Sequence, residues 1–368
     1  MAMRSRRQFL RLSSVAVGAL GFGGLLQACS SAPAPPPTVA PTAAATKPAA
    51  ATSVPPPPVP TATSAPAVAT KTNVPKLLAS YGSPVGSFAA LWMAKEIGAF
   101  DKYGVQVDVQ LVETSAAVPA MINNSIDVQE VSAAPIITAD VNGKQDLVFI
   151  GSTLNHPILA MYSTADIVSA EQLRSKTIAS DKPGTPVDYS ARLCLSLLGL
   201  KPDDVDLRAI GNATEIVAAM LSGQVQAGMV APPQSFQVEP KGFHLLQDIF
   251  SQPYQNVGVV AKRSRMDELG PALKPFLAGL RDGILAWNAQ PELAMKVQDE
   301  YGKVGDQEIL RKSYEFYTKV APFEPSLQPT IPGIKAMMDF LASTSLPVVA
   351  DYSPEQFVDT RFLNQLPT

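Results

Sequence analysis

The chain has 368 residues, and its 29 lysines and arginines against 32 aspartates and glutamates give a formal charge of −3. This acidic balance, without a basic run that carries interleaved aromatic residues, argues against a nucleic-acid partner. Two cysteines and two histidines are too few for a disulfide framework or a Cys/His metal site, so we expect no metal and no cofactor.

Residues 1–28 are typical of an export signal and not of a folded segment. Residues 5–11 read SRRQFLR, a twin-arginine pattern, and the apolar run 15–26 that follows is too short to span a membrane. The sequence LQAC at 26–29 has the form of a lipobox, in which Cys29 is lipidated and becomes the new N-terminus. The order of these signals favours a lipoprotein over an ordinary N-terminal anchor helix. We expect a bacterial protein exported by the twin-arginine route and held by its lipid in the periplasm or on the outer face of the cell membrane.

Residues 29–74 form the next segment, which is almost wholly Pro, Ala, Thr, Ser and Val after the cysteine. Such a composition cannot bury a core and predicts a disordered, extended tether. Residues 75–368 are long enough for two domains. Loss of the four leader arginines leaves the mature chain with a charge of about −7.

The folded part begins with a strand, a loop and a helix. Residues 76–98 read KLLASYGSPVGSFAALWMAKEIG, with a strand to about Tyr81 and a helix that ends at Gly98. Alternating apolar residues and turn signals then predict strands at 105–111, 125–132, 146–151 and 158–163, and helices at 116–123 and from Pro135. Strands that alternate with helices indicate parallel βαβ units and an α/β fold.

The stretch 176–199 repeats the same arrangement. It contains an expected strand at 177–180, a Pro/Gly loop, and a helix from Pro186 or Val187 to about Leu198 with Gly199 at its C′ position. Exposed backbone N–H groups at such a helix start hold anionic or polar ligands. We expect this unit and residues 76–98 to face each other across a cleft.

The rest of the chain returns from a second domain to the first. Strands are expected at 205–210, 226–230 and 257–261, a capped helix at 213–222, another helix from Pro232, and further helices at 266–287, 292–301, 307–320 and 331–341. This order predicts one lobe from residues 75–160 and 258–368, and a second lobe from residues 161–257.

Four stretches carry a resemblance to a known family: ALWMAKEIGAFDKYGVQVDV (90–109), IDVQEVSAAP (126–135), EQLRSKTIA (171–179) and AAMLSGQVQA (218–227). Behind a lipoprotein signal, they resemble the NMT1/THI5-like and SsuA/TauA-type solute-binding proteins of ABC importers. The resemblance covers about residues 75–260. It implies a type II periplasmic-binding-protein fold, in which two α/β lobes joined by two crossing strands hold a ligand between them. It also implies a monomer that delivers a small polar organic or anionic solute, such as a sulfonate, taurine, nitrate or a pyrimidine, to a membrane permease.

The resemblance places the ligand at loop–helix junctions. Backbone N–H groups and hydroxyls would donate hydrogen bonds, although each hydroxyl also suits a plain N-cap. Asp188 either stabilises the first turn of its helix or selects an amine or N–H donor, and Asn155 and His156 lie either in the pocket or at the hinge. The expected ligand-binding residues are Gly82, Ser83, Pro84, Ser87, Phe88, Ser132, Ala133, Asn155, His156, Gly184, Thr185, Asp188, Tyr189, Ala231 and Pro232.

Two other functions stay open from the sequence. An enzyme on the same scaffold, of a pyrimidine-synthesising or desulfinating kind, would need a nucleophile or base, for which Cys194 and His156 are the candidates. No G-x-S-x-G, H-E-x-x-H or phosphate-loop motif occurs, so we expect no catalytic residue. A sensory lipoprotein would use the same cleft to signal.

Overall fold

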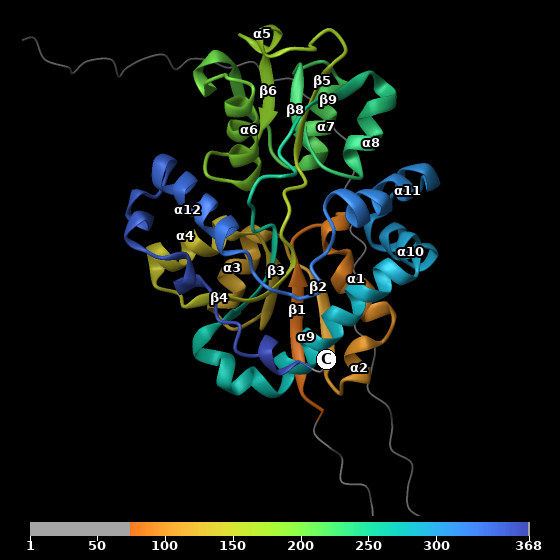
Figure 1. Cartoon of the computed structure of the whole chain (residues 1–368), viewed down its shortest axis with the longest axis vertical. Helices are drawn as coiled ribbons and strands as arrows, with labels where there is room; N and C mark the ends of the chain where they lie inside the picture. Colours follow the sequence, from red (N-terminus) through yellow and green to blue (C-terminus); the bar gives the residue numbers. More distant parts are fainter. Residues whose placement is uncertain (1–73, 367–368) are drawn as a thin grey trace, which may run out of the picture. The chain divides into compact units, whose positions relative to one another are not determined.

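The computed structural model describes residues 74–366 of the chain. The expected signal peptide at 1–28, the lipidation site Cys29 and the tether up to residue 73 lie outside these residues. Within the described part, the named strands form two separate five-stranded sheets, each with helices packed on it (Figure 1). We call the sheets and their flanking helices lobe 1 and lobe 2.

The sheet of lobe 1 has the strand order β2-β1-β3-β10-β4. β1 is parallel to β2 and β3, whereas β10 is antiparallel to both of its neighbours. The antiparallel strand is the one that the chain adds after it returns from lobe 2. The strands are β1 (Lys76–Tyr81), β2 (Gln106–Leu111), β3 (Val128–Val131), β4 (Leu147–Leu154) and β10 (Val257–Lys262).

Helices cover both faces of this sheet, which is why β4 is buried along all of its length. One apolar core contains residues of α1 (Ala89–Glu96), α2 (Ala99–Lys102) and α9 (Met266–Ala289). The other contains residues of α3 (Thr114–Ile122), α4 (Ala133–Gly143) and α12 (Ile331–Thr344). Helices α1 and α9 pack closely because residue 283 is glycine, where a Cβ atom would lie 2.7 Å from the Ala94 nitrogen.

The sheet of lobe 2 has the strand order β7-β6-β8-β5-β9. β6 is parallel to β7 and β8, and β5 is antiparallel to β8 and β9. The strands are β5 (Ala160–Thr164), β6 (Thr177–Ser180), β7 (Asp206–Ala209), β8 (Ala227–Val230) and β9 (Phe243–Asp248). Its helices are α5 (Ala170–Leu173), α6 (Pro186–Leu197), α7 (Ala213–Leu221) and α8 (Gln234–Val238).

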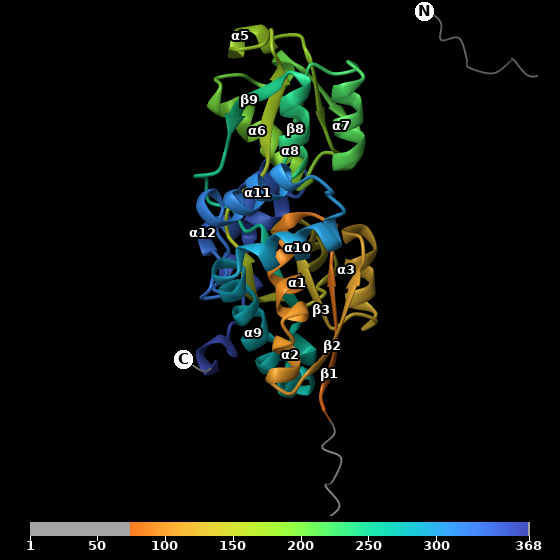
Figure 2. The ribbon, with the colours of Figure 1, turned by 90° about the vertical axis from the view of Figure 1, so that its right-hand side faces the viewer.

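Two segments cross between the lobes, from β4 to β5 and from β9 to β10. The chain then continues into α10 (Pro291–Gly302), α11 (Gln307–Glu315) and a π-helical turn, Phe316–Val320. Helix α10 packs on α1 of lobe 1, and α11 contacts α8 of lobe 2. Both views show α11 beside the lower edge of lobe 2 (Figures 1 and 2). The C-terminal helices therefore form a third link between the lobes.

Most of the expected elements are present. Helix α6 begins at Pro186, Gly199 adopts φ +73°, and Asn212 and Glu215 cap α7 reciprocally, as the sequence predicted. Strand β9 was not expected, because this edge strand has only one fully buried residue and a weak apolar pattern. Helix α4 begins at Ala133 and not at Pro135. None of the helices in residues 74–366 is long and apolar enough to span a membrane.

Candidate functional site

A cavity of about 760 Å³ lies between the two lobes, a size typical of small-molecule sites. Lobe 1 supplies one wall from α3 and α4, and lobe 2 supplies the other from the loop between β6 and α6. We call it the α4–α6 cavity. Its lining residues are Ser115, Val118, Pro119, Ser132, Ala134, Pro135, Thr138, Ala139, Asn142 and Asp181–Pro186.

The start of α4 opens onto this cavity. Ser132 is its N-cap residue, and the Ser132 hydroxyl makes no capping hydrogen bond. The neighbouring Ala133 is buried, and its N–H donates to the Gln255 carbonyl at 3.3 Å. The positive end of the helix dipole and an available hydroxyl at the same point favour a polar or anionic ligand.

The start of α6, on the opposite wall, is already neutralised. The Asp188 carboxylate is only 1% exposed, and it accepts from the Gly184 N–H at 2.9 Å and from Arg192 Nε at 2.8 Å. The Thr185 hydroxyl donates to the Lys182 carbonyl at 2.8 Å and accepts from the Asp188 N–H at 3.3 Å. Both groups therefore hold the loop in shape. Gly184 is required there because it adopts φ +84°.

Tyr189 lies in an apolar interface between the lobes. Its ring stacks on Tyr254 with centroids 5.4 Å apart and meets the edge of Phe340 at 5.1 Å. It belongs to the same core cluster as α4 and α12 of lobe 1. Burial raises the pKa of the Tyr189 phenol. The side chain thus attaches α6 to lobe 1.

The junction between β1 and α1 is covered by the C-terminal helices. A Cβ atom on Gly86 would lie 2.5 Å from the Tyr317 ring and 2.6 Å from the Gln298 amide nitrogen. Ser87 is buried, and Phe88 packs on Tyr81 with ring centroids 5.9 Å apart. Nearer β1, the expected site residues Gly82 and Ser83 are half-buried and Pro84 is exposed.

Tyr317 also connects this junction to lobe 2, because its hydroxyl donates to the Pro232 carbonyl at 3.2 Å. The adjacent Ala231 carbonyl accepts from the Ser235 N–H in the first turn of α8. The sequence identified both residues of this junction but not Tyr317, which follows them by some 85 positions.

Asn155 and His156 lie at the first crossing segment. They line a separate cavity of about 590 Å³ together with Phe250, Pro253 and Thr330. The Asn155 side chain accepts from Ser152 Oγ at 2.7 Å and donates to the Gln328 carbonyl at 2.8 Å. The His156 carbonyl accepts from Asn256 at 2.7 Å, a contact between the two crossing segments. The side-chain contacts of Asn155 support the hinge alternative for that residue, whereas His156 joins the two crossing segments through its backbone.

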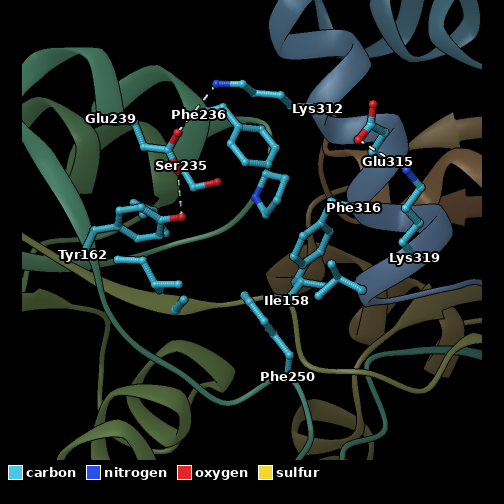
Figure 3. Close-up of a pocket in the computed structure, with 15 residues that line it drawn as sticks. Ile158, Tyr162, Ser235, Phe236, Glu239, Phe250, Lys312, Glu315, Phe316 and Lys319 are labelled. Carbon is cyan, nitrogen blue, oxygen red and sulfur yellow. Dashed lines mark hydrogen bonds and ion pairs between the residues drawn. The ribbon is translucent and has the colours of Figure 1, made fainter.

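A third cavity, of about 440 Å³, lies between lobe 2 and the α11 region (Figure 3). Its lining is Ile158, Ala160, Tyr162, Val230, Pro232, Ser235, Phe236, Glu239, Leu245, Phe250, Lys312, Glu315, Phe316, Lys319 and Val320. We call it the α8–α11 pocket. Pro232 alone among its lining residues was expected in a ligand site.

Two buried titratable groups are held in their protonated forms. Glu130 is 1% exposed, and burial raises its pKa to about 8, although Thr153 Oγ1 donates to its Oε1 at 3.2 Å. Burial raises the pKa of the Cys194 thiol to about 12, so no thiolate forms at neutral pH. Within residues 74–366, no cluster of three His, Cys, Asp or Glu side chains has the arrangement of a metal site.

Sequence reasoning identified part of the α4–α6 cavity. Ser132, Gly184 and Thr185 line it as expected, whereas the α3 residues and the second and third turns of α4 were missed. Ser115 follows the end of β2, and the carboxyl ends of parallel strands line ligand sites in α/β folds. Thr138 and Asn142 lie one and two turns beyond Ala134 on α4. The position of Ser115 after β2 and the four-residue spacing along α4 are the sequence signals that point to the missed residues.

Comparison with known proteins agrees with this architecture. The sequence model of the family described as NMT1/THI5 like matches residues 86–294. The aliphatic sulphonate-binding protein SsuA of Escherichia coli superposes with a TM-score of 0.61 at 19% identity, covering 80% of this chain and 92% of that one. The nitrate-binding protein NrtA of Synechocystis PCC 6803 gives a TM-score of 0.62 at 14% identity, covering 80% and 88%.

An enzyme shares the same architecture. The desulfurization enzyme DSZB superposes with a TM-score of 0.62 at 15% identity and covers 79% of this chain and 98% of that one. No curated protein matches the chain by sequence. At these identities the likenesses establish the fold, which is the type II periplasmic-binding-protein fold with its two α/β lobes.

Proposed function

The chain belongs to the NMT1/THI5-like family, and from this we propose that it is the extracytoplasmic solute-binding component of an ABC importer. It captures a small polar organic or anionic solute in the α4–α6 cavity and delivers it to a membrane permease. Binding-protein neighbours on the same fold support this role.

One observation carries the proposal: the cavity takes one wall from each lobe. A ligand can contact α4 of lobe 1 and the β6–α6 loop of lobe 2 at the same time only when the two lobes are close together. Ligand binding therefore stabilises that arrangement by its differential affinity for it. Closure of two lobes about crossing segments is the motion by which such proteins present a bound solute.

The lining residues favour a polar or anionic solute. Hydroxyls of Ser115, Ser132 and Thr138 and the amide of Asn142 supply hydrogen-bond donors on the lobe 1 wall. Lys182 adds a positive charge on the lobe 2 wall, beside Asp181. Sulfonates, taurine, nitrate and pyrimidine-like solutes all present acceptors of the matching kind.

Titration of the purified protein tests the assignment. Sulfonates, taurine, nitrate, pyrimidines and amines are added in turn while the melting temperature and the radius of gyration are followed. A member of the first four groups should raise the melting temperature and reduce the radius. Thr138→Val should abolish the shift, and Ser343→Ala, outside the cavity on α12, should preserve it. A flat response to every solute would contradict the proposal.

The remaining sequence predictions form part of the same proposal. The expected boundaries at residues 160 and 258 fall at the beginning of β5 and β10, the strands that follow the two crossings. Export by the twin-arginine route, the lipid anchor at Cys29 and the monomeric state stay predictions. So does ligand binding by the fifteen expected residues, among which Asp188 and Asn155 keep the structural alternatives expected from the sequence. Cys29→Ser should release the protein from the membrane fraction, and Arg6→Lys with Arg7→Lys should retain it inside the cell.

A desulfinating or pyrimidine-synthesising enzyme is the second candidate, because an enzyme shares the fold. Its candidate nucleophile, Cys194, is buried and its thiol donates to the Gln247 carbonyl at 3.6 Å. Turnover that is abolished by Cys194→Ala or His156→Ala would establish the enzyme. A sensory role for the cleft would be indicated by neighbouring genes that encode no permease or ATPase.

A further inference from the structure

We propose that the α8–α11 pocket is a second ligand site, which takes an organic anion with an apolar, ring-containing body. The pocket is separate from the α4–α6 cavity, since no residue lines both. One side of it comes from lobe 2 and the other from α11 and the π-helical turn. An occupant would therefore contact lobe 2 and the C-terminal segment at the same time.

Aromatic and aliphatic side chains form the body of the pocket. Phe236, Phe250 and Phe316 come from α8, the second crossing segment and the π-helical turn, and Figure 3 shows their rings turned toward the same space. Phe250 meets Phe316 edge to face with centroids 5.1 Å apart. Leu245 and Val320 are 42% and 44% exposed. Apolar side chains that remain exposed around a hollow favour a ligand with an apolar body.

The carboxylates of the pocket are already occupied. Glu239 Oε1 accepts from the Tyr162 hydroxyl at 3.3 Å, and Glu239 Oε2 lies 3.8 Å from Lys312 Nζ. Burial raises the pKa of Tyr162 to about 12, so the phenol stays protonated at neutral pH and can donate its hydrogen bond to Glu239. Glu315 pairs with both Arg311 and Lys319 on its own helical segment. A cationic head group would have to displace these partners.

The lysines, by contrast, keep donor capacity. Each ammonium group has three N–H donors. The Lys312 ammonium group lies 3.8 Å from the Glu239 carboxylate and 5.8 Å from the centre of the Phe236 ring. The Lys319 ammonium group lies 3.5 Å from the Glu315 carboxylate. Figure 3 shows Lys312 reaching from α11 toward Glu239 and Lys319 lying beside Glu315. Charge complementarity therefore selects a carboxylate or similar anion at the lysines and an apolar group among the rings.

Three probes that share a phenylbutyl group and differ in the charge of their polar group test whether the pocket prefers an anion. Isothermal titration of the full chain uses 4-phenylbutanoate, 4-phenylbutanol and 4-phenylbutylamine. We expect the anion to bind, the alcohol to bind about tenfold more weakly through loss of charge-assisted hydrogen bonds, and the amine to bind more weakly still. Equal affinity for all three, preference for the amine, or no binding would overturn the proposal.

Variants locate the site. Leu245→Trp adds bulk at an exposed position of the lining, and Lys312→Gln removes one ammonium group, so both should weaken 4-phenylbutanoate binding about tenfold or more. Lys335→Gln removes another exposed lysine, on α12 and outside the pocket, and should leave the affinity unchanged. Thr138→Val, in the α4–α6 cavity, should also leave it unchanged, which separates this site from the proposed solute site.

Two further results would count against the proposal. The first is anion binding that survives Leu245→Trp but is lost in Thr138→Val, because the probe would then occupy the α4–α6 cavity. The second is a dimer in sedimentation that Leu245→Trp converts to a monomer, because a second copy of the chain would then cover the pocket. Melting temperatures within 2 degrees or so of the unsubstituted chain, as expected for exposed positions, confirm that the variants are folded.

Discussion

The hydroxyl of Tyr317 donates a hydrogen bond to the carbonyl of Pro232 at 3.2 Å, and this contact joins the C-terminal helices to lobe 2. The Tyr317 ring is fully buried and stacks on Phe323 with centroids 5.7 Å apart. The same ring lies against Gly86, in the 3-10 turn that precedes α1. One residue of the π-helical turn therefore touches a loop–helix junction of each lobe.

Tyr317→Phe should loosen this link while it preserves the packing of the ring. The Pro232 carbonyl loses its donor, which should lower the free energy of unfolding by about 1 kcal/mol. Because the contact exists only in this interlobe arrangement, small-angle scattering should show a larger radius of gyration. Tyr314→Phe, one turn earlier, is the control. Unchanged stability and radius in Tyr317→Phe would show that the contact does not set the lobe arrangement.

Tyr189 should contribute through its ring and not through its hydroxyl. Tyr189→Ala removes the stack on Tyr254 and the edge contact with Phe340, and should cost about 3 kcal/mol in urea denaturation. Tyr189→Phe keeps both contacts and should stay within about 1 kcal/mol of the original chain. If both variants lost the same free energy of unfolding, the hydroxyl and not the ring would be the stabilising group.

Asp188 should act on stability and not on ligand choice. Asp188→Ala leaves the Gly184 N–H and the Arg192 guanidinium without their acceptor and should cost about 3 kcal/mol. Because both carboxylate oxygens are engaged, the ratio of affinities for anionic and amine solutes should not change in Asp188→Asn. A shift of this ratio toward anions would show instead that the carboxylate faces the ligand.

Glu130 should make the stability depend on pH. Its pKa rises from 4.5 to about 8 on folding because burial disfavours the charged carboxylate. Between these two pKa values the folded state holds a proton that the unfolded state has lost. The contribution of Glu130 to stability is therefore fully present below pH 4.5 and is lost as pH rises toward 8. The slope in this window should approach about 1.4 kcal/mol per pH unit.

Glu130→Gln removes the titrating group and keeps a neutral side chain of similar shape. Urea denaturation from pH 4 to pH 9 should show the slope in the original chain and its loss in the variant. Glu308→Gln, an exposed carboxylate on α11, is the matched control and should keep the slope. A slope of the same size in Glu130→Gln would assign the pH dependence to other groups.

Local patterns were sufficient for most of the fold. Three examples are the Pro and Gly at the two ends of α6, the Asn212–Glu215 capping box and the alternating residues of β2. Each pattern involves residues only a few positions apart, so it can be recognised without knowledge of tertiary contacts. Strand β9 escaped because an edge strand buries little of its surface and has no strong period. The order of strands and helices also predicted two lobes.

The candidate site was only partly predictable. Ser132, Gly184 and Thr185 follow the expected rule that loop–helix junctions line the cleft. Asp188 and Tyr189 share the same junction, but their partners are Arg192 on the next turn and Tyr254 on a crossing segment. Which side chains at a junction face a cavity depends on what packs over them.

The sequence by itself determined most of the elements, their order and the family, because caps, turns and periodicity are properties of neighbouring residues. Only the tertiary structure decided that Tyr317 covers the β1–α1 junction and that Lys312 reaches the pocket beside Phe236. The physical reason is that the C-terminal helices fold back onto segments far earlier in the chain. Contacts across such a separation arise from packing of complementary surfaces, which no local pattern records.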